Sequence, residues 1–411
     1  MPDKYYNLTL PNGIRLVHRP HTLSEIVHCG LVLNTGSRDE TPDNNGVAHF
    51  IEHAVFKGTE KRSSNYILKR IENVGGELNA YTTREKTCYY ASCLKQYAGR
   101  AVDIISDIAF NATFPEKEMQ KEKKVIIEEI EMYDDSADES IYDEFYAMLF
   151  KDHSLGFNIL GTSESVNKLD SNILRSFVDQ NYISDNIILS LTGNISIAEA
   201  ERLARKFLEG RPAVHKEDTR KAPLINSAFH ETKEKDFAQT HCMIGSPAYS
   251  RYDSKRYGLT LIHNILGGLG MSSRLNMAVR EKHGYTYHIS SNYSNYQDTG
   301  VFSIYFACDK KNLNRCRKLV HLELKKMRDN KLSAIQLHQA KQQLLGMVAM
   351  MEENQSVHMQ AQARSVLDYG RVYTFKDYLQ KVDEVTASEI LEISNEILDP
   401  SAMSELVYMD V

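Results

Sequence analysis

Two histidines and a glutamate stand close together in residues 46–58, which have the sequence GVAHFIEHAVFKG. In a helix, His49, Glu52 and His53 at positions i, i+3 and i+4 would share one face. Two imidazoles one turn apart can bind a single cation, and a carboxylate between them can reach a water molecule on that cation. The pattern therefore predicts a metal site that activates water, although an amphipathic helix with histidines packed in its core would show the same residues.

A catalytic zinc site needs a third protein ligand, which must come from elsewhere in the chain. The best source is residues 115–134, PEKEMQKEKKVIIEEIEMYD, where a proline suits the first helical turn and apolar residues recur with helical spacing. Projection at about 100° per residue puts Glu122 and Glu129 on the edge of the apolar stripe, whereas Glu128 and Glu131 point away. Glu122 and Glu129 could face a metal, or they could form a solvated charged flank.

Three segments carry a resemblance to a known family: HFIEH, ENVGGELNAYTTREKTCYY and VIIEEIE. The first has the H-x-x-E-H order of inverzincins. Over most of its length the chain resembles the pitrilysin/insulinase family, specifically the short bacterial branch that is similar to mitochondrial processing peptidase. The resemblance implies that His49, His53 and Glu129 bind Zn²⁺, that Glu52 is the general base, and that Glu122 supports the site.

The implied activity is that of a zinc-dependent endopeptidase. In such an enzyme, zinc polarises the scissile carbonyl and lowers the pKa of its bound water. Glu52 would take the proton of that water and pass it to the leaving amine. Two other functions stay open: a non-catalytic assembly subunit or partner of a related peptidase, and a zinc-binding protein without hydrolytic activity.

The same resemblance implies residues that contact a peptide substrate. In the family, the edge strand that contains LNAYT pairs with the substrate backbone, which makes Asn79 and Ala80 candidates, although an ordinary edge strand would have the same sequence. Arg280 and Tyr287 resemble the family's Arg/Tyr pair, which reaches the substrate from the half opposite the zinc. Tyr285 is a rival for Tyr287, and an arginine on a helix flank is most often structural.

Composition excludes several classes of protein. The chain has 411 residues, of which 42% are hydrophobic and 25% charged, and this length predicts two globular domains. A formal charge of −6 argues against general nucleic-acid binding. The sequence lacks a signal-peptide pattern and a long apolar run, which predicts a cytoplasmic protein with no membrane segment. The six cysteines form no C-x-x-C pair, so we expect reduced thiols.

Local patterns predict the elements that position these residues. Residues 6–17, with a Pro-Asn-Gly turn in the middle, have the alternation of a β-hairpin. Another strand is expected at residues 26–35, directly before the polar loop and the motif helix. The polar segment GRPAVHKEDTRKAP then marks a domain boundary. We place a zinc-binding domain at residues 1–210, a linker at 211–225 and a second domain at 226–411.

The second domain repeats the rhythm of the first. GLTLIHNILGG follows the pattern of GVAHFIEHAVFKG, but Leu261, Asn264 and Ile265 stand where the first copy has His49, Glu52 and His53. We therefore predict an α+β fold of two homologous αβ domains, each a mainly antiparallel sheet with helices packed on one face, the second without zinc. A coincidental rhythm is the alternative.

The resemblance also implies a partner. The family encloses its substrate in a chamber of four αβ domains, and this chain supplies two. We therefore expect a dimer, either of identical chains or with an inactive relative, in which Arg280 and Tyr287 are offered to the partner's zinc.

Overall fold

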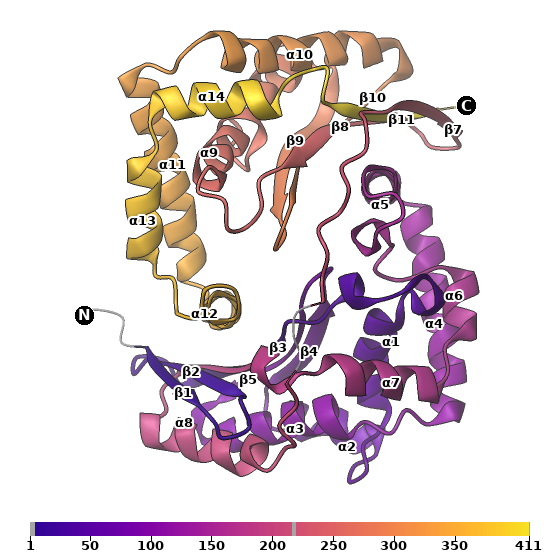
Figure 1. Cartoon of the computed structure of the whole chain (residues 1–411), viewed down its shortest axis with the longest axis vertical. Helices are drawn as coiled ribbons and strands as arrows, with labels where there is room; N and C mark the ends of the chain where they lie inside the picture. Colours follow the sequence, from indigo (N-terminus) through magenta and orange to yellow (C-terminus); the bar gives the residue numbers. More distant parts are fainter. Residues whose placement is uncertain (1–4, 216–218, 411) are drawn as a thin grey trace. The chain divides into compact units, whose positions relative to one another are not determined.

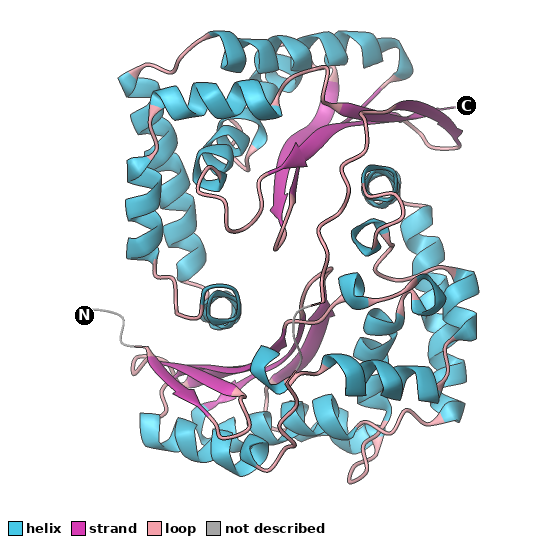
Figure 2. Ribbon diagram, viewed as in Figure 1, coloured by secondary structure: helices cyan, strands magenta, loops and turns pink. Residues whose placement is uncertain are grey.

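The chain folds into two compact units, each built around one sheet (Figure 2). The structure is a computed structural model that describes residues 5–215 and 219–410. Unit 1 contains the chain up to Glu131, Phe157–Arg220 and Met350–Thr374, and unit 2 contains Met132–Gly156, Lys221–Ala349 and the chain from Phe375 onward.

The sheet of unit 1 has the strand order β1-β2-β6-β3-β5-β4, so that β4 is an edge strand. Only the pair β2–β6 is parallel. Leu8 lies opposite Leu16 across the antiparallel pair β1–β2, which confirms the predicted hairpin. The strands are β1 (Tyr6–Thr9), β2 (Arg15–Pro20), β3 (Ile26–Leu33), β4 (Glu77–Thr82), β5 (Thr87–Leu94) and β6 (Ile187–Gly193).

Helices cover both faces of this sheet (Figure 1). Helix α3 packs against β3 and β5, whereas α12 packs against β3 and β6 from the other side. The close approach of α12 explains Gly30, because a Cβ there would lie 2.5 Å from the sulfur of Met359. The helices are α1 (Val47–Ala54), α2 (Ser64–Glu72), α3 (Ala98–Asn111), α4 (Glu116–Asp134), α6 (Ser163–Lys168), α7 (Ser171–Asn181), α8 (Ile197–Ala204) and α12 (Gln355–Tyr369).

Unit 2 has the strand order β7-β11-β8-β10-β9, and only the pair β7–β11 is parallel. Its strands are β7 (His230–Lys235), β8 (Thr240–Ala248), β9 (Thr286–Asn295), β10 (Gly300–Cys308) and β11 (Ser404–Asp410). Its helices are α5 (Ala137–Leu149), α9 (Arg256–Gly267), α10 (Leu313–Asp329), α11 (Ala334–Glu352), α13 (Phe375–Glu384) and α14 (Ala387–Ile397).

The two sheets repeat one topology. Strands β2, β6, β3, β5 and β4 of unit 1 occupy the same order, with the same directions, as β7, β11, β8, β10 and β9 of unit 2. Helix α1 follows β3 as α9 follows β8, and α3 follows β5 as α10 follows β10. The predicted α+β fold of two homologous αβ domains is therefore confirmed. The prediction placed helices on only one face of each sheet, but in unit 1 helix α12 packs on the other face as well.

Helix α5 from the first half of the sequence belongs to unit 2, and α12 from the second half belongs to unit 1. The compact units therefore differ from the predicted domains 1–210 and 226–411. Gln362 of α12 donates from Nε2 to Ser190 Oγ of β6 at 2.8 Å. In unit 2, Tyr408 of β11 donates from its hydroxyl to Glu144 Oε2 of α5 at 2.6 Å. The boundaries differ because the long helices α4 and α11 each carry the chain out of the unit in which they begin.

The remaining features concern solvent and redox environment. Among the described helices, none combines the length and the apolar composition that a membrane crossing requires. All six cysteines are buried and unbridged, as expected for reduced thiols.

Candidate metal centre

Helix α1, which carries His49, Glu52 and His53, begins at a glycine that no other residue could replace easily. Gly46 has φ of 90°, and a Cβ there would lie 2.6 Å from the carbonyl oxygen of Leu160. The carboxylate of Glu40 accepts hydrogen bonds from the backbone N–H groups of Gly46 and Ala48 and from Asn45 Nδ2, each at 2.9 Å. Burial raises the pKa of Glu40 to about 8, against the lowering effect of these donors. Glu40 thus holds the N-terminus of α1 in place.

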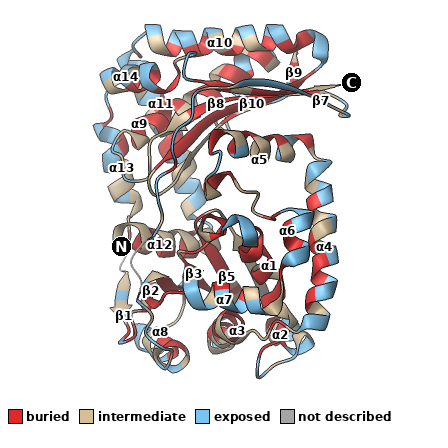
Figure 3. Ribbon diagram, turned by 45° about the vertical axis from the view of Figure 1, so that its right-hand side comes forward, coloured by how far each residue is buried: buried red, intermediate tan, exposed pale blue. Residues whose placement is uncertain are grey.

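Helix α4 presents two acids toward α1. Its stripe of Met119, Ile126 and Ile130 is buried, while the opposite side is exposed (Figure 3). Glu122 and Glu129 lie one heptad apart on the edge of this stripe, where the sequence places them. Glu122 is buried and the side chain of Glu129 is partly exposed, so neither has the fully solvated position of an ordinary surface glutamate.

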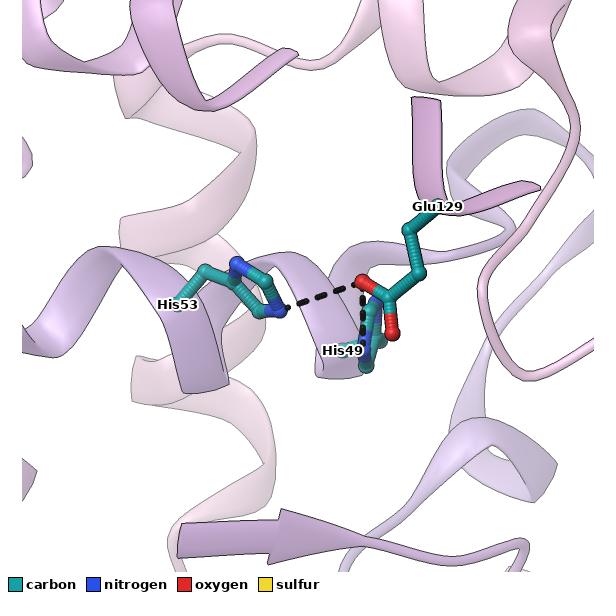
Figure 4. Close-up of side chains that lie close together, drawn as sticks. All are labelled: His49, His53 and Glu129. Atoms are coloured by element: carbon teal, nitrogen blue, oxygen red, sulfur yellow. Dashed lines mark ion pairs between the residues drawn. The ribbon is translucent and has the colours of Figure 1, made fainter. Parts of the chain in front are cut away.

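Three side chains converge between α1 and α4 (Figure 4). Glu129 Oε2 lies 3.8 Å from His49 Nε2 and 3.5 Å from His53 Nε2. One ligand atom from each of the three lies within 4.8 Å of the others. Two imidazole nitrogens and one carboxylate oxygen form a donor set typical of catalytic zinc, which leaves a coordination position for water. The residues therefore fit a zinc ion.

The environment of the two histidines favours ligation. Burial, with a smaller contribution from His53, lowers the pKa of His49 to about 3, so that His49 carries the free lone pair that a metal needs. His49 Nδ1 is buried without a hydrogen-bond partner among the described residues. Burial lowers the pKa of His53, but Glu122 and Glu129 outweigh it and raise the pKa. The Nδ1 atom of His49 is not the nitrogen that faces Glu129, so the fit to a metal rests on the Nε2 atoms of both rings.

A chain of contacts orients His53. Its Nδ1 lies 3.2 Å from Glu122 Oε2, and Lys57 Nζ lies 2.5 Å from Glu122 Oε1. Burial raises the pKa of Glu122, but the hydrogen bonds from His53 and Lys57 outweigh it and lower the pKa. An ionised Glu122 accepts the Nδ1 proton of His53 and leaves Nε2 free for a metal. Neither Lys57 nor Glu40 is predicted from the sequence, although an acid ahead of the helix start and a lysine one turn after His53 are the available signals.

Glu52 lies on the same helix beside the edge strand β4. Burial raises the pKa of Glu52, against the lowering effects of the neighbouring Thr82 of β4 and of His53. One carboxylate oxygen, Oε2, is buried without a partner among the described residues. A raised pKa brings a carboxylate closer to the range in which it can exchange protons near neutral pH.

The residues expected to contact substrate fall into two groups. Asn79 and Ala80 lie on β4, at the free edge of the sheet of unit 1. Arg280 and Tyr287 belong to unit 2, where the guanidinium lies over the Tyr287 ring at 5.3 Å and Tyr287 is 83% exposed. The rival Tyr285 stacks on His283 at 5.1 Å. Contact of any of these residues with substrate stays a prediction.

Comparisons with known proteins agree with the geometry. Residues 16–163 match the family model described as Insulinase (Peptidase family M16), and residues 168–344 match the Peptidase M16 inactive domain. An uncharacterized zinc protease of Bacillus subtilis, YmxG, is 31% identical over 392 residues, which are 95% of this chain and 94% of that protein. The chain belongs to the insulinase (M16) peptidase family.

Other members of the M16 family are similar over comparable lengths. An uncharacterized zinc protease of Streptomyces coelicolor is 32% identical over 95% of this chain and 86% of its own length. Two solved structures share the fold. A protease from Helicobacter pylori has a TM-score of 0.90 at 19% identity over 99% of both chains. An M16 inactive-domain protein from Pseudomonas fluorescens has a TM-score of 0.89 at 20% identity, covering 99% of this chain and 98% of that one.

Proposed function

We propose that this member of the M16 family is a zinc-dependent endopeptidase that cleaves peptides or unfolded polypeptide segments. The observation that carries the proposal is the convergence of His49, His53 and Glu129 from two helices, with one carboxylate oxygen within 3.8 Å of both Nε2 atoms. These three side chains would hold one zinc ion per chain. The zinc-protease names of the relatives support the choice of metal.

Each residue of the site has a separate role in this mechanism. Bound zinc supplies a Lewis acid, which polarises a carbonyl and lowers the pKa of a water molecule. Glu52 accepts a proton from the attacking water and returns it to the leaving amine, a role for which its raised pKa suits it. Glu122 fixes the orientation of His53 through the 3.2 Å contact to Nδ1.

The edge strand β4 provides a docking position for an extended substrate. It pairs with β5 on one side only, so the backbone groups of alternate residues that point to its free edge, around Asn79 and Ala80, can bond a peptide strand. Helix α1 contacts β4, and Glu52 reaches Thr82 on the same strand. A peptide on this edge would therefore lie beside the general base.

The proposed active form is a dimer that encloses the substrate. The partner is a second copy of this chain or an inactive relative, and Arg280 and Tyr287 are then offered to the zinc site of the partner. A mass measurement in solution, made on the purified chain alone, distinguishes a homodimer from a chain that requires a different partner. The cytoplasmic location stays a prediction.

A non-catalytic assembly subunit is the second candidate function. The match of residues 168–344 to the inactive domain of the family favours it, because one half of this chain lacks the metal residues. The presence of all four motif residues in the other half favours the peptidase.

A peptidase assay with metal analysis tests the proposal. Wild-type protein should contain zinc and cleave an unstructured peptide, and a chelator should abolish the cleavage. Glu52→Gln should retain zinc and lose cleavage by about 10²- to 10⁴-fold. Asn264→Gln, at the equivalent place in α9, is the matched control and should cleave normally. Cleavage by Glu52→Gln at the wild-type rate would remove Glu52 as the base, and zinc-loaded wild-type protein without activity would favour the assembly subunit.

A further inference from the structure

Unit 2 contains a cavity of about 780 Å³ that is separate from the metal residues of unit 1. It lies between α10, the beginning of α11 and the π-helical segment η8 (Asn276–Glu281). Its volume is within the range of small-molecule sites. Segments of π-helix are rare and are often found at functional sites, because they widen the helix locally.

Part of the cavity wall is apolar and open to solvent. Met277 of η8 is 49% exposed and Leu322 of α10 is 45% exposed, while Leu332 is buried behind them. Large apolar side chains that are exposed together within one cavity favour a ligand with an apolar part.

The guanidinium of Arg274 lines the same cavity, where the Glu323 carboxylate attracts it without forming an ion pair with it. Arg274 is half-buried, and within the described part of the chain its side chain has no ion pair and no hydrogen bond. Glu323 also lines the cavity, but its carboxylate accepts from Lys326 Nζ at 2.6 Å. Burial lowers the pKa of Arg274, which reflects the cost of leaving this charge partly desolvated. An anion bound in the cavity would remove that cost.

The equivalent place in unit 1 contains ion pairs between arginines and aspartates. Helices α2 and α3 there correspond to η8 and α10, since each pair flanks, in the same order along the chain, the edge strand and the strand beside it. Arg62, just ahead of α2, pairs with Asp103 at 2.8 Å and with Asp107 at 2.6 Å, and Arg70 lies 3.7 Å from Asp103. Helix α3 thus forms ion pairs with the arginines that face it, whereas Glu323 of α10 attracts Arg274 without an ion pair to it.

The remaining charges define the ligand further. Lys282 and Lys331 are exposed on the cavity lining, and within the described chain no ion pair neutralises either. Glu281 and Glu323 are the carboxylates of the lining, and they would repel a ligand with several negative charges. Arg274, Lys282, Lys326 and Lys331 outnumber these two carboxylates, so the net charge of the lining is positive and favours an anionic ligand.

We propose that this cavity binds a small organic monoanion, whose carboxylate pairs with Arg274 and whose hydrocarbon part packs against Met277, Leu322 and Leu332. A planar guanidinium binds a carboxylate in a bidentate manner, which suits this head group. The ligand is a free aliphatic acid or the carboxyl end of a peptide that terminates in an apolar residue. The site is independent of the metal centre and of the proposed hydrolysis.

Calorimetric titration of the full chain tests the site. Octanoate should bind, and octan-1-ol and acetate, which lack the charge and the hydrocarbon part respectively, should bind at least about tenfold more weakly. Arg274→Met should weaken octanoate binding at least about tenfold. Arg315→Met removes the same charge from α10 outside the cavity and should leave octanoate binding unchanged. Acetyl-leucyl-leucine with a free carboxyl group, compared with its amide, distinguishes a peptide terminus from a free acid.

A second variant keeps the test decisive if Arg274→Met fails to fold. Leu322→Glu places a carboxylate on an exposed wall position, so the fold should persist while octanoate binding falls at least about tenfold. Two results would overturn the proposal: octanoate binding no tighter than octan-1-ol binding, or octanoate binding that survives both Arg274→Met and Leu322→Glu.

Discussion

Helices α1 and α9 hold the same place in two copies of one topology, and each carries a histidine, His49 being buried and His263 half-buried. Burial lowers the pKa of His49 to about 3 and that of His263 to about 4. They differ in their partners. His263 Nδ1 lies 2.9 Å from Ser291 Oγ, whereas His49 Nδ1 has no partner among the described residues. A low histidine pKa is therefore shared by a structural residue and a candidate ligand, and hydrogen-bond satisfaction separates them.

The helices that follow show a second difference. Helix α4 supplies Glu122 and Glu129, but α11, at the equivalent place in the other half, contains no acidic residue before Glu352. Unit 2 has thus lost the carboxylate that completes the donor set as well as both motif histidines. Among the described residues, the three side chains that could hold a metal together all belong to unit 1.

The largest difference between the two units is expected when one histidine is removed from each. His49→Ala should reduce zinc from one ion per chain to near none after dialysis and abolish peptide cleavage, because catalytic zinc requires three protein ligands. His263→Ala should retain full zinc content. Elemental analysis of both dialysed proteins checks the expectation, and loss of zinc from His263→Ala would place a ligand in the wrong unit.

The structural histidine should instead show in the pH dependence of stability. Unfolded His263 binds a proton near pH 6.5, but the folded protein does so only near pH 4. Between these values the unfolded state holds more protons, so stability rises with pH and is lost as pH falls from 6.5 to 4. The full shift corresponds to on the order of 3 kcal/mol. In urea unfolding, the advantage of wild type over His263→Gln should shrink by that amount between pH 7 and pH 4, and a constant difference would contradict it.

Helix α4 allows a direct comparison of zinc affinity between variants of a buried acid, Glu122, and an exposed acid, Glu128. Glu122→Ala should weaken zinc affinity about 10- to 100-fold without unfolding the chain, since residues that orient a ligand histidine contribute that much. Glu128→Ala, on the exposed side of the same helix, should have no effect. Competition with a chromophoric chelator measures both affinities. Equal affinities of the two variants would show that the contact between Glu122 and His53 does not matter for metal binding.

Sequence periodicity was sufficient to predict that Glu122 and Glu129 lie on the inward side of their helix, because helical spacing determines which residues share a face. The repeat of the αβ domain was also predictable, since strand and turn patterns are local. The reciprocal exchange of α5 and α12 was not, because no local pattern records which sheet a helix covers. The hydrogen bond from Gln362 to Ser190, for example, joins residues that are 172 positions apart in the sequence.

Two supporting residues were missed for the same reason. Glu40 caps α1 from a loop, and only the folded loop brings its carboxylate to the N–H groups of Gly46 and Ala48. Lys57 is near His53 in sequence, but its partner Glu122 comes from another helix. Sequence spacing thus identifies the side chains that could bind a metal and leaves the groups that orient them undetected.

The smallest expected effect concerns the last contact of this chain of orientation. Lys57 Nζ lies 2.5 Å from Glu122 Oε1, and within the described residues of unit 1 no other lysine or arginine pairs with that carboxylate. Lys57→Gln removes one charge-assisted hydrogen bond, so zinc affinity should fall about twofold to tenfold. Lys57→Arg should restore most of the affinity, which a role in packing alone would not predict. If Lys57→Gln binds zinc as tightly as wild type does, Lys57 does not contribute to the orientation of His53. The difference in zinc binding between α1 and α9 would then depend on their ligand residues alone.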